Sequence, residues 1–232
     1  MTEAHTRRAL IVGASRGLGL ALVEEYARRG VEVVATVRDA ESEALRALTE
    51  RFPVAVEHVD VTDALQISAL AHQLARDQFD LLFVVAGISL APVDEPASDI
   101  ADDAFTRTML TNALGAMRVV ERLAALVPQT GTVAVMSSGQ GSVANNTSGG
   151  FEVYRASKAA LNQLMRSYAA RHAAEPKTLL LLAPGWIRTD MGGEGAGLDI
   201  AEAIPPLVDT IEAQHGTPGL HYLDRHGATV PW

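Results

Sequence analysis

The chain has 232 residues, a net charge of −9 at pH 7 and no cysteine. Hydrophobic residues make up 48% and charged residues 20%, which is enough apolar material for one domain with a sizeable core and excludes a disordered chain. The negative charge argues against nucleic acid or an anionic membrane as the main partner, and the lack of cysteine excludes disulfides and thiolate metal sites. A small-molecule partner is therefore the expectation.

The apolar run 10–12 predicts a short strand, which a glycine-rich turn ends before a helix over 18–29. The run is too short for a signal-peptide core, and no stretch approaches the roughly 18 apolar residues of a membrane span, so we expect a cytoplasmic protein. Further strands are predicted over 31–37, 54–59, 81–85, 132–137 and 178–183, which are short and mostly apolar. Helices are predicted over 40–51, 63–77, 101–126 and 154–174.

Strand and helix alternate along the chain, which is typical of a doubly wound parallel sheet with helices on both faces. The predicted fold class is therefore α/β, in one domain over residues 1–232. Ligands of such sheets bind beyond the carboxyl ends of the strands. The segment around 186–217, which follows the last of these strands, is expected to cover a substrate.

Three glycines, Gly13, Gly17 and Gly19, follow the first strand in the spacing Gly-x-x-x-Gly-x-Gly. Glycine allows a sharp turn and a close approach of the backbone to a ligand, and free N–H groups at the start of the next helix attract an anion. The turn therefore predicts a phosphate site, although an ordinary strand-to-helix connection uses glycines in the same way.

Tyr154 and Lys158 stand four residues apart in a strongly helical stretch, so their side chains share one face of the helix. The charge of a nearby ammonium favours the phenolate and lets the tyrosine exchange a proton near neutral pH. Such a pair also occurs by chance on partly exposed helices, so the surrounding motifs decide its meaning.

Together these motifs resemble the short-chain dehydrogenase/reductase family in their order and spacing. The match runs from Ala9 to about Met191. It rests on Gly13-Ala14-Ser15-Arg16-Gly17-Leu18-Gly19, Asp60-Val61-Thr62-Asp63, Asn112-Ala113-Leu114-Gly115, Ser137-Ser138, Tyr154-Arg155-Ala156-Ser157-Lys158 and Pro184-Gly185-Trp186-Ile187-Arg188-Thr189. The resemblance implies a single Rossmann-type sheet of about seven strands in the order 3-2-1-4-5-6-7.

A narrower similarity is to the C-factor and sniffer-like carbonyl reductase branch of that family. It rests on Gly141-Ser142-Val143, on the longer insertion with Asn145-Asn146-Thr147-Ser148-Gly149-Gly150, and on Gly227-x-x-x-Pro231-Trp232. The insertion separates the serine pair from Tyr154 and borders the substrate site, so it either shapes access to that site or is a plain surface loop.

The resemblance implies a role for each of four residues. Tyr154 protonates a carbonyl oxygen, or deprotonates the alcohol in reverse, and Ser138, the second serine of its pair, hydrogen-bonds that oxygen. Lys158 holds the nicotinamide ribose and biases Tyr154 by its charge, and Asn112 supports a proton-relay water through a distortion of its helix. Hydride comes from the cofactor, so no metal site is expected.

The charge at the end of the second strand favours NADP(H) over NAD(H). An acidic residue there suits the ribose 2′-hydroxyl, whereas Arg38, beside Asp39, suits a 2′-phosphate, and Arg16 in the glycine turn can approach the same phosphate. By resemblance, the cofactor also contacts residues of the turn, the later strand ends and the catalytic helix: Gly13, Ser15, Gly17, Leu18, Gly19, Asp60, Val61, Ala86, Gly87, Tyr154, Lys158, Pro184, Gly185, Ile187 and Thr189.

Val84 and Val85 depart from the family pattern, which reads Asn-Asn-Ala-Gly at this place. Ala86 and Gly87 keep the close backbone approach, but the polar contacts that tie this strand end to its neighbours are lost. Weaker cofactor binding or a looser strand end is the expected consequence.

Two functions follow from the resemblance. The first is an NADP(H)-dependent oxidoreductase that interconverts an aldehyde or ketone and an alcohol, because the set of Asn112, Ser138, Tyr154 and Lys158 is complete. The second is a dinucleotide-binding signalling or sensor protein with little catalysis. The region 186–217 lacks charged clusters, which favours a small or medium apolar carbonyl, and the two long helices imply a homodimer or homotetramer.

Overall fold

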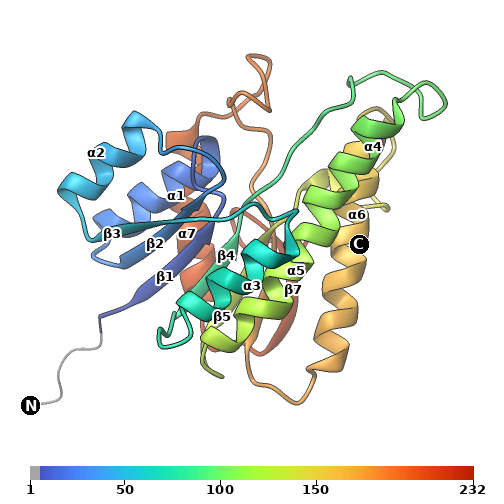
Figure 1. Ribbon diagram of the computed structural model, residues 1–232. Coiled ribbons are helices and arrows are strands. Elements are labelled where there is room, and N and C mark those ends of the chain that lie inside the picture. Colours follow the sequence, from blue (N-terminus) through green and yellow to red (C-terminus); the bar gives the residue numbers. More distant parts are fainter. Residues whose placement is uncertain (1–5) are drawn as a thin grey trace, which may run out of the picture.

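A seven-stranded parallel sheet forms the centre of the molecule in the computed structural model, which describes residues 6–232 (Figure 1). Its strand order is β3-β2-β1-β4-β5-β6-β7, so the predicted fold class and order are confirmed. The strands are β1 (Arg8–Val12), β2 (Glu32–Val37), β3 (Val54–His58), β4 (Leu81–Val84), β5 (Thr132–Met136), β6 (Thr178–Ala183) and β7 (Gly219–Asp224). Because all are parallel, their carboxyl ends share one edge.

The helices connect the strands and differ from the prediction mainly at their ends. They are α1 (Gly17–Arg28), α2 (Glu43–Arg51), α3 (Ala64–Gln73), α4 (Asp102–Met109), the π-helix η1 (Leu110–Gly115), α5 (Ala116–Leu123), the 3-10 helices η2 (Ala124–Leu126) and η3 (Gly139–Gly141), α6 (Glu152–Arg171) and α7 (Ile200–Ala213). Helix α2 begins later than predicted because the Ser42 hydroxyl accepts the N–H of Leu45. Helix α3 ends earlier because turn hydrogen bonds replace the helical ones at Ala75 and Asp77.

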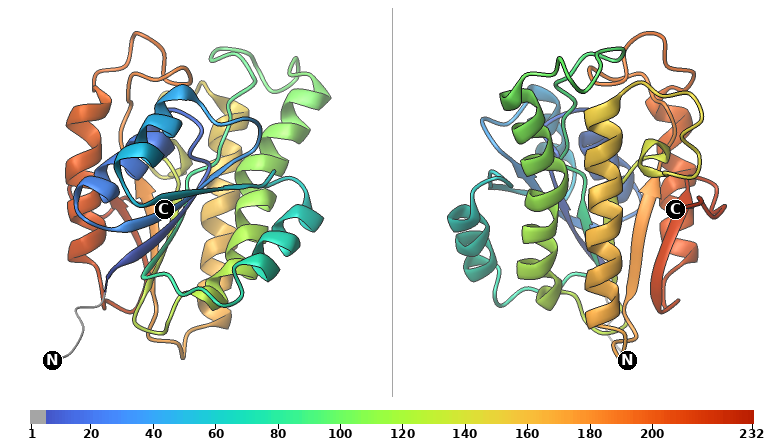
Figure 2. Two further views of the ribbon diagram at one scale, coloured as in Figure 1. Left: turned by 60° about the vertical axis from the view of Figure 1, so that its left-hand side comes forward. Right: turned by 90° about the vertical axis from the view of Figure 1, so that its right-hand side faces the viewer.

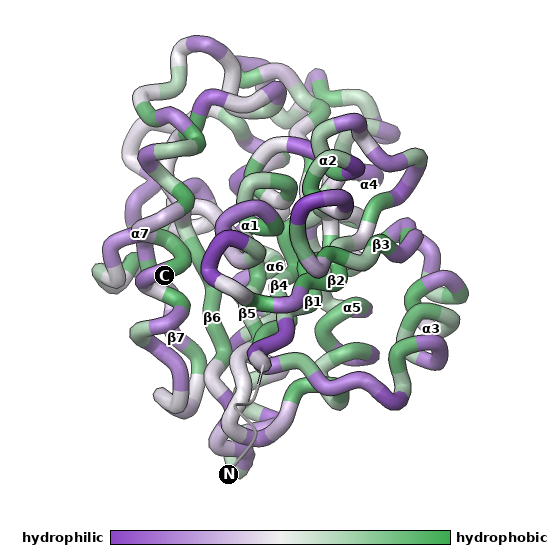
Figure 3. Tube along the Cα trace, turned by 90° about the vertical axis from the view of Figure 1, so that its left-hand side faces the viewer, coloured by the Kyte–Doolittle hydropathy of each residue, from purple (hydrophilic) through white to green (hydrophobic). Residues whose placement is uncertain are grey.

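Two apolar cores lie on the two faces of the sheet (Figure 2). Leu10 and Val12 of β1 point toward α3, α5 and α6, whereas Ala9 and Ile11 point toward α1, α2 and α7. Figure 3 shows the hydrophobic colour along the interior strands, most plainly on β6. Strands buried on both faces need uniformly apolar sequences, which is why the strand runs are easy to recognise.

The segment 186–217 contains two parts with different surroundings. Residues 200–213 form α7, whose Ile204, Leu207 and Val208 belong to the core on the α1 face. Their spacing is that of an apolar helix face, and this face packs α7 beside α1 in the helix layer that covers one side of the sheet. The loop 186–199 rises beyond the carboxyl end of β6, on the same side as the long loop after β4 (Figure 1).

The glycine turn packs closely against the end of β4 because Gly13, the residue at the contact, has no side chain. Gly13 has a φ of +97°, and a Cβ at this residue would lie 2.6 Å from the backbone nitrogen of Ala86. A Cβ at Gly19 would overlap the carbonyl oxygen of Gly13. The two glycines therefore let β1, the turn and α1 pack at a distance that any larger residue prevents.

Gly19→Ala should lower the free energy of unfolding by about 2 kcal/mol, because the added methyl group must push α1 away from the turn. Urea denaturation followed by circular dichroism measures this change. Gly197→Ala is the matched control, since a Cβ there meets nothing within 4 Å and φ is ordinary. Equal stability of the two variants would show that the turn has room for a side chain.

Candidate active site

Four predicted catalytic residues meet at the carboxyl edge of the sheet. Ser138 follows β5, Tyr154 and Lys158 lie on the first turns of α6, and Asn112 lies in η1. The Tyr154 phenol lies beside the Ser138 hydroxyl, and the Lys158 Nζ lies 5.7 Å from the centroid of the Tyr154 ring. The structure therefore brings the serine, tyrosine and lysine into one contiguous group.

Lys158 is a buried cation at the end of β5. Its Nζ donates a hydrogen bond of 2.9 Å to the carbonyl oxygen of Met136, and burial lowers the pKa of the ammonium to about 8. A Cβ at Gly87 would lie 3.4 Å from both Lys158 Nζ and Asn112 Oδ1. The end of β4 thus abuts the lysine and the asparagine together.

The pKa of the Tyr154 phenol is raised above its ordinary value. Burial is the largest cause of the raised pKa, and the neighbouring Ser138 side chain acts in the opposite direction. The charge argument from sequence predicts a lowered pKa, so its direction is wrong for this structure. The physical reason is that desolvation of the phenolate outweighs the favourable contacts.

Asn112 ties its helix to the loop after β4. Its Oδ1 accepts the N–H of Ile88 at 2.8 Å, and its Nδ2 donates to the Ile88 carbonyl at 2.7 Å and to the Ser157 hydroxyl at 3.0 Å. The backbone around it is the π-helix η1, which interrupts the single helix predicted over 101–126. The part of Asn112 in a proton relay stays a prediction.

The two serines after β5 have different partners. The Ser137 hydroxyl is buried and donates to Asn162 Oδ1 at 2.6 Å, whereas the Ser138 hydroxyl contacts Tyr154 and accepts the N–H of Gln140. The Ser137 hydroxyl proton is therefore used in a buried hydrogen bond to Asn162. This division favours Ser138 as the residue that faces a substrate.

Both arginines predicted to read a 2′-phosphate lie at the same edge and are paired with carboxylates. Arg16 is ion-paired with Asp190, and Arg38 with Asp39 at 2.9 Å. All four side chains are at least 64% exposed. Such exposed pairs are weak and water-accessible, so each guanidinium remains open to an incoming anion.

The remaining predicted cofactor contacts lie at the same edge, in the turn after β1 and the first residues of α1 and on the loops after β3, β4 and β6. Asp60 accepts the N–H and hydroxyl of Thr62, and a Cβ at Gly115 would lie 2.7 Å from the Val61 carbonyl. Thr189 accepts the N–H of Gly192 at 3.0 Å. The other positions after β1 are Ser15, Gly17 and Leu18, and those after β6 are Pro184, Gly185 and Ile187.

The end of β4 is held in place although it lacks the two asparagines. The N–H groups of Val85 and Ala86 both donate to the Val12 carbonyl, at 2.8 and 3.0 Å. The Val84 side chain is buried in the core on the α5 face. Backbone hydrogen bonds and Asn112 thus satisfy the polar groups that the sequence departure left in question.

Tyr222, Asn162 and Asp190 are contacts of the site that sequence reasoning missed. The Tyr222 phenol donates to the Ser138 carbonyl, Asn162 accepts from Ser137, and Asp190 pairs with Arg16. Residues 219–224 mix Leu and Tyr with Gly, His and Asp, so no strand is predicted there, and no motif connects a tyrosine in this segment to a serine 84 residues earlier.

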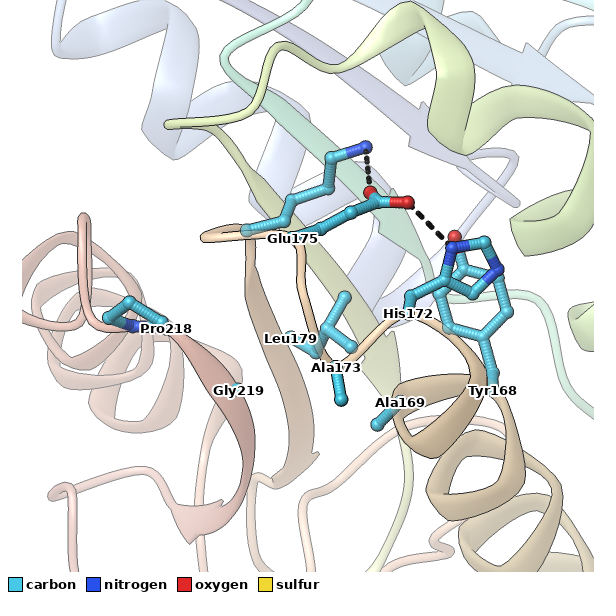
Figure 4. A pocket seen from close by; sticks show the side chains of 9 residues that line it. Tyr168, Ala169, His172, Ala173, Glu175, Leu179, Pro218 and Gly219 are labelled. Carbon is cyan, nitrogen blue, oxygen red and sulfur yellow. Dashed lines mark hydrogen bonds and ion pairs between the residues drawn. The ribbon is translucent and has the colours of Figure 1, made fainter.

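A cavity also lies at the opposite edge of the sheet, at the amino ends of β6 and β7 (Figure 4). Its lining includes His172, Glu175 and Lys177: the His172 ring is hydrogen-bonded to Glu175 at 2.7 Å, and Lys177 is ion-paired with Glu175 at 3.4 Å. Because Ser138 follows the carboxyl end of β5, this cavity is separate from the candidate active site. The His172, Glu175 and Lys177 side chains are already hydrogen-bonded or ion-paired with one another.

Within residues 6–232, no helix is both long enough and apolar enough to cross a membrane. Nor does the described part of the chain hold three or more His, Asp or Glu side chains placed to bind a metal ion.

The doubly wound sheet, the glycine turn and the Ser-Tyr-Lys group define an oxidoreductase of the Rossmann class. A family model described as enoyl-(acyl carrier protein) reductase matches residues 13–211. The chain belongs to the short-chain dehydrogenase/reductase family.

Three relatives illustrate the similarity. A short-chain dehydrogenase/reductase from Burkholderia multivorans, solved with bound NADP, is 49% identical, with a TM-score of 0.96 over 98% of this chain and 100% of its own. A carbonyl reductase from Pseudomonas aeruginosa PAO1 in complex with NADP is 35% identical, with a TM-score of 0.90 over the same shares. The C-signal protein of Myxococcus xanthus is 36% identical over 71% of this chain and 99% of its own length.

Lys158→Met should raise the free energy of unfolding at pH 7. Burial lowers the lysine pKa from 10.5 to about 8, a difference of about 2.5 units that corresponds to about 3 kcal/mol of destabilisation. Loss of the bond to the Met136 carbonyl offsets about 1 kcal/mol, so the net gain is about 2 kcal/mol. The folded state binds fewer protons than the unfolded state between pH 8 and 10.5, so the gain fades as pH rises through that window.

Urea denaturation at pH 7 and pH 10.5 measures this difference. The control is Lys177→Met at the only other lysine of the chain, which removes a cation paired with Glu175 and should destabilise the protein. A Lys158→Met variant that is less stable than the wild type at pH 7 would contradict the expected cost of the buried ammonium.

Proposed function

We propose that the protein is an NADP(H)-dependent oxidoreductase that interconverts an aldehyde or ketone and the corresponding alcohol. The observation that carries the proposal is the placement of the Tyr154 phenol beside the Ser138 hydroxyl and the buried ammonium of Lys158. A proton donor and a second hydroxyl are thereby aimed at one place, where a carbonyl oxygen could accept from both.

The chain's own residues fit a dinucleotide. The start of α1 has no side-chain cap, so its first N–H groups are free for a pyrophosphate, and a Cβ at Gly17 would meet no atom nearer than 3.9 Å, which leaves room there for a ligand. Arg16 and Arg38 would bind the 2′-phosphate by exchanging an exposed carboxylate partner for a phosphate dianion, with which a guanidinium forms stronger paired hydrogen bonds. NADP bound to two similar proteins supports the same assignment.

The raised pKa of Tyr154 suits carbonyl reduction, because the phenol keeps its proton at neutral pH until a substrate oxygen takes it. The nicotinamide, when bound, supplies the hydride to the carbonyl carbon. Tyr154 gives its proton to the oxygen, Ser138 holds that oxygen, and the product is an alcohol. The tyrosinate that remains next to the Lys158 ammonium then regains a proton from water.

Apolar side chains near the site favour a small or medium apolar carbonyl as substrate. Trp186 and Met191, in the loop after β6, are 56% and 48% exposed, and the Trp186 Nε1 is anchored to the Gly192 carbonyl at 2.8 Å. A homodimer or homotetramer is supported by the α4–α6 side of the molecule, where Phe105 and Leu164 are 47% and 40% exposed (Figure 2).

Tyr154→Phe should lower kcat at least about a hundredfold, because it removes only the proton donor. NADPH oxidation with benzaldehyde, acetophenone and cyclohexanone measures turnover, and fluorescence titration measures NADPH binding, which should stay within about threefold. Undiminished turnover in this variant would overturn the role of Tyr154. Tight NADPH binding by the wild type without turnover of any carbonyl would instead favour the sensor function, which the similarity to C-signal also suggests.

Arg16→Ala should raise the Michaelis constant for NADPH about tenfold or more and that for NADH less than twofold, since only NADPH carries the 2′-phosphate. Steady-state kinetics with both cofactors test this. Arg28→Ala is the control, because Arg28 is similarly exposed but pairs with Glu24 within α1. An equal effect on both cofactors would remove Arg16 from 2′-phosphate recognition.

A further inference from the structure

The phenol of Tyr222 reaches the backbone of the candidate catalytic serine from the edge strand of the sheet. Tyr222 pairs with Leu181 across β6 and β7, and its side chain is 2% exposed, in the core beneath α6. The phenolic hydroxyl donates to the Ser138 carbonyl, which also accepts the N–H of Gly141 at 2.9 Å. With two donors on one oxygen, the peptide that follows Ser138 has a fixed orientation.

A polar network surrounds this contact and joins three elements. The Ser137 hydroxyl donates to Asn162 Oδ1 at 2.6 Å, and Asn162 Nδ2 donates to the Gly141 carbonyl at 3.2 Å. The Ser137 and Asn162 side chains lie beside the Tyr222 phenol. Strand β7, helix α6 and the segment 137–141 are thereby locked together through buried groups, where such bonds are strongest.

The segment 227–232 covers Tyr222 from outside. Its Val230 N–H donates to the Tyr222 carbonyl at 2.8 Å, and the Trp232 ring lies 5.5 Å from the Tyr222 ring. The Arg166 guanidinium stacks over Trp232 at 4.5 Å, and the Trp232 carbonyl accepts the N–H of Ala144 at 3.0 Å. The tyrosine ring is therefore held in one orientation between the core and this segment.

We infer that Tyr222 is a positioning residue for carbonyl reduction: its phenol holds the Ser138 peptide so that the Ser138 hydroxyl faces Tyr154 and the substrate oxygen. The inference rests on the proposed function. Without the phenol, the Ser138 carbonyl keeps only Gly141 as donor, and the peptide gains freedom to rotate. A small displacement of a group that must hold the reacting oxygen is enough to slow the chemical step.

Tyr222→Phe removes only the hydroxyl and leaves the ring packed against Trp232. We expect kcat for the carbonyl reduced best by the wild type to fall about tenfold at saturating NADPH, while the Michaelis constant for NADPH stays within twofold. Tyr168→Phe is the matched control, because Tyr168 is also a buried tyrosine but lies at the opposite edge of the sheet, beside the cavity of Figure 4. Its kcat should stay within twofold of the wild type.

A double-mutant cycle tests whether Tyr222 acts through Ser138. In a Ser138→Ala background, assayed at higher enzyme concentration, the tenfold effect of Tyr222→Phe should shrink to less than twofold. If the Ser138→Ala variant shows no turnover, the inference is tested by kcat and the Michaelis constant for NADPH of Tyr222→Phe and Tyr168→Phe alone.

The outcomes separate this inference from the proposed function. A wild-type chain that reduces no carbonyl overturns the proposed function and this inference with it. An active wild type overturns the inference alone if kcat of Tyr222→Phe stays within twofold, if its Michaelis constant for NADPH rises as much as kcat falls, if Tyr168→Phe slows turnover equally, or if the tenfold effect persists in the Ser138→Ala background.

Discussion

The buried ammonium of Lys158 is the interaction on which the rest of the site depends. It lies on α6, bonds the carbonyl at the end of β5, and approaches Gly87 at the end of β4. A cation without solvent opposes folding, and burial of this one lowers its pKa to about 8. The surrounding core must therefore supply enough stabilisation to hold it, which the apolar layers on both sheet faces provide.

The end of β4 shows how one polar contact can be replaced by another. The strand ends in Val84 and Val85, which cannot hydrogen-bond through their side chains, yet their region is fixed by the Val12 carbonyl and the Asn112 amide. The π-helix η1 surrounds Asn112 and lets its chain pass close to the Val61 carbonyl at Gly115. The π-helix η1, with Gly115 and Asn112, therefore holds the end of β4 in place beside Lys158.

Charge is arranged differently at the two ends of the site. At the catalytic end, Lys158 is buried and Tyr154 is half-buried, and the pKa values of both respond mainly to the loss of solvent. At the phosphate end, Arg16 and Arg38 remain exposed beside carboxylates. A chain with a net charge of −9 thus keeps local positive charge where an anion would bind. Because water screens the exposed Arg–Asp pairs, each arginine loses little free energy when it exchanges its carboxylate partner for a phosphate.

The sequence by itself determined the six strands β1 to β6, because strands buried on both faces must be apolar, and its motifs gave the family and, by resemblance, the strand order. Glycines marked a place where backbones meet closely, as at Gly13 and Gly19. The sequence also supplied Ser138, Tyr154 and Lys158 as a motif. Only the tertiary structure decided which way the Tyr154 pKa moves, that α7 packs in the core, and that Asp190 meets Arg16. These outcomes depend on burial and on contacts between residues far apart in the chain. The hydrogen bond from Tyr222 to Ser138 is the clearest case, because a local sequence pattern does not show which distant strand lies beside a loop.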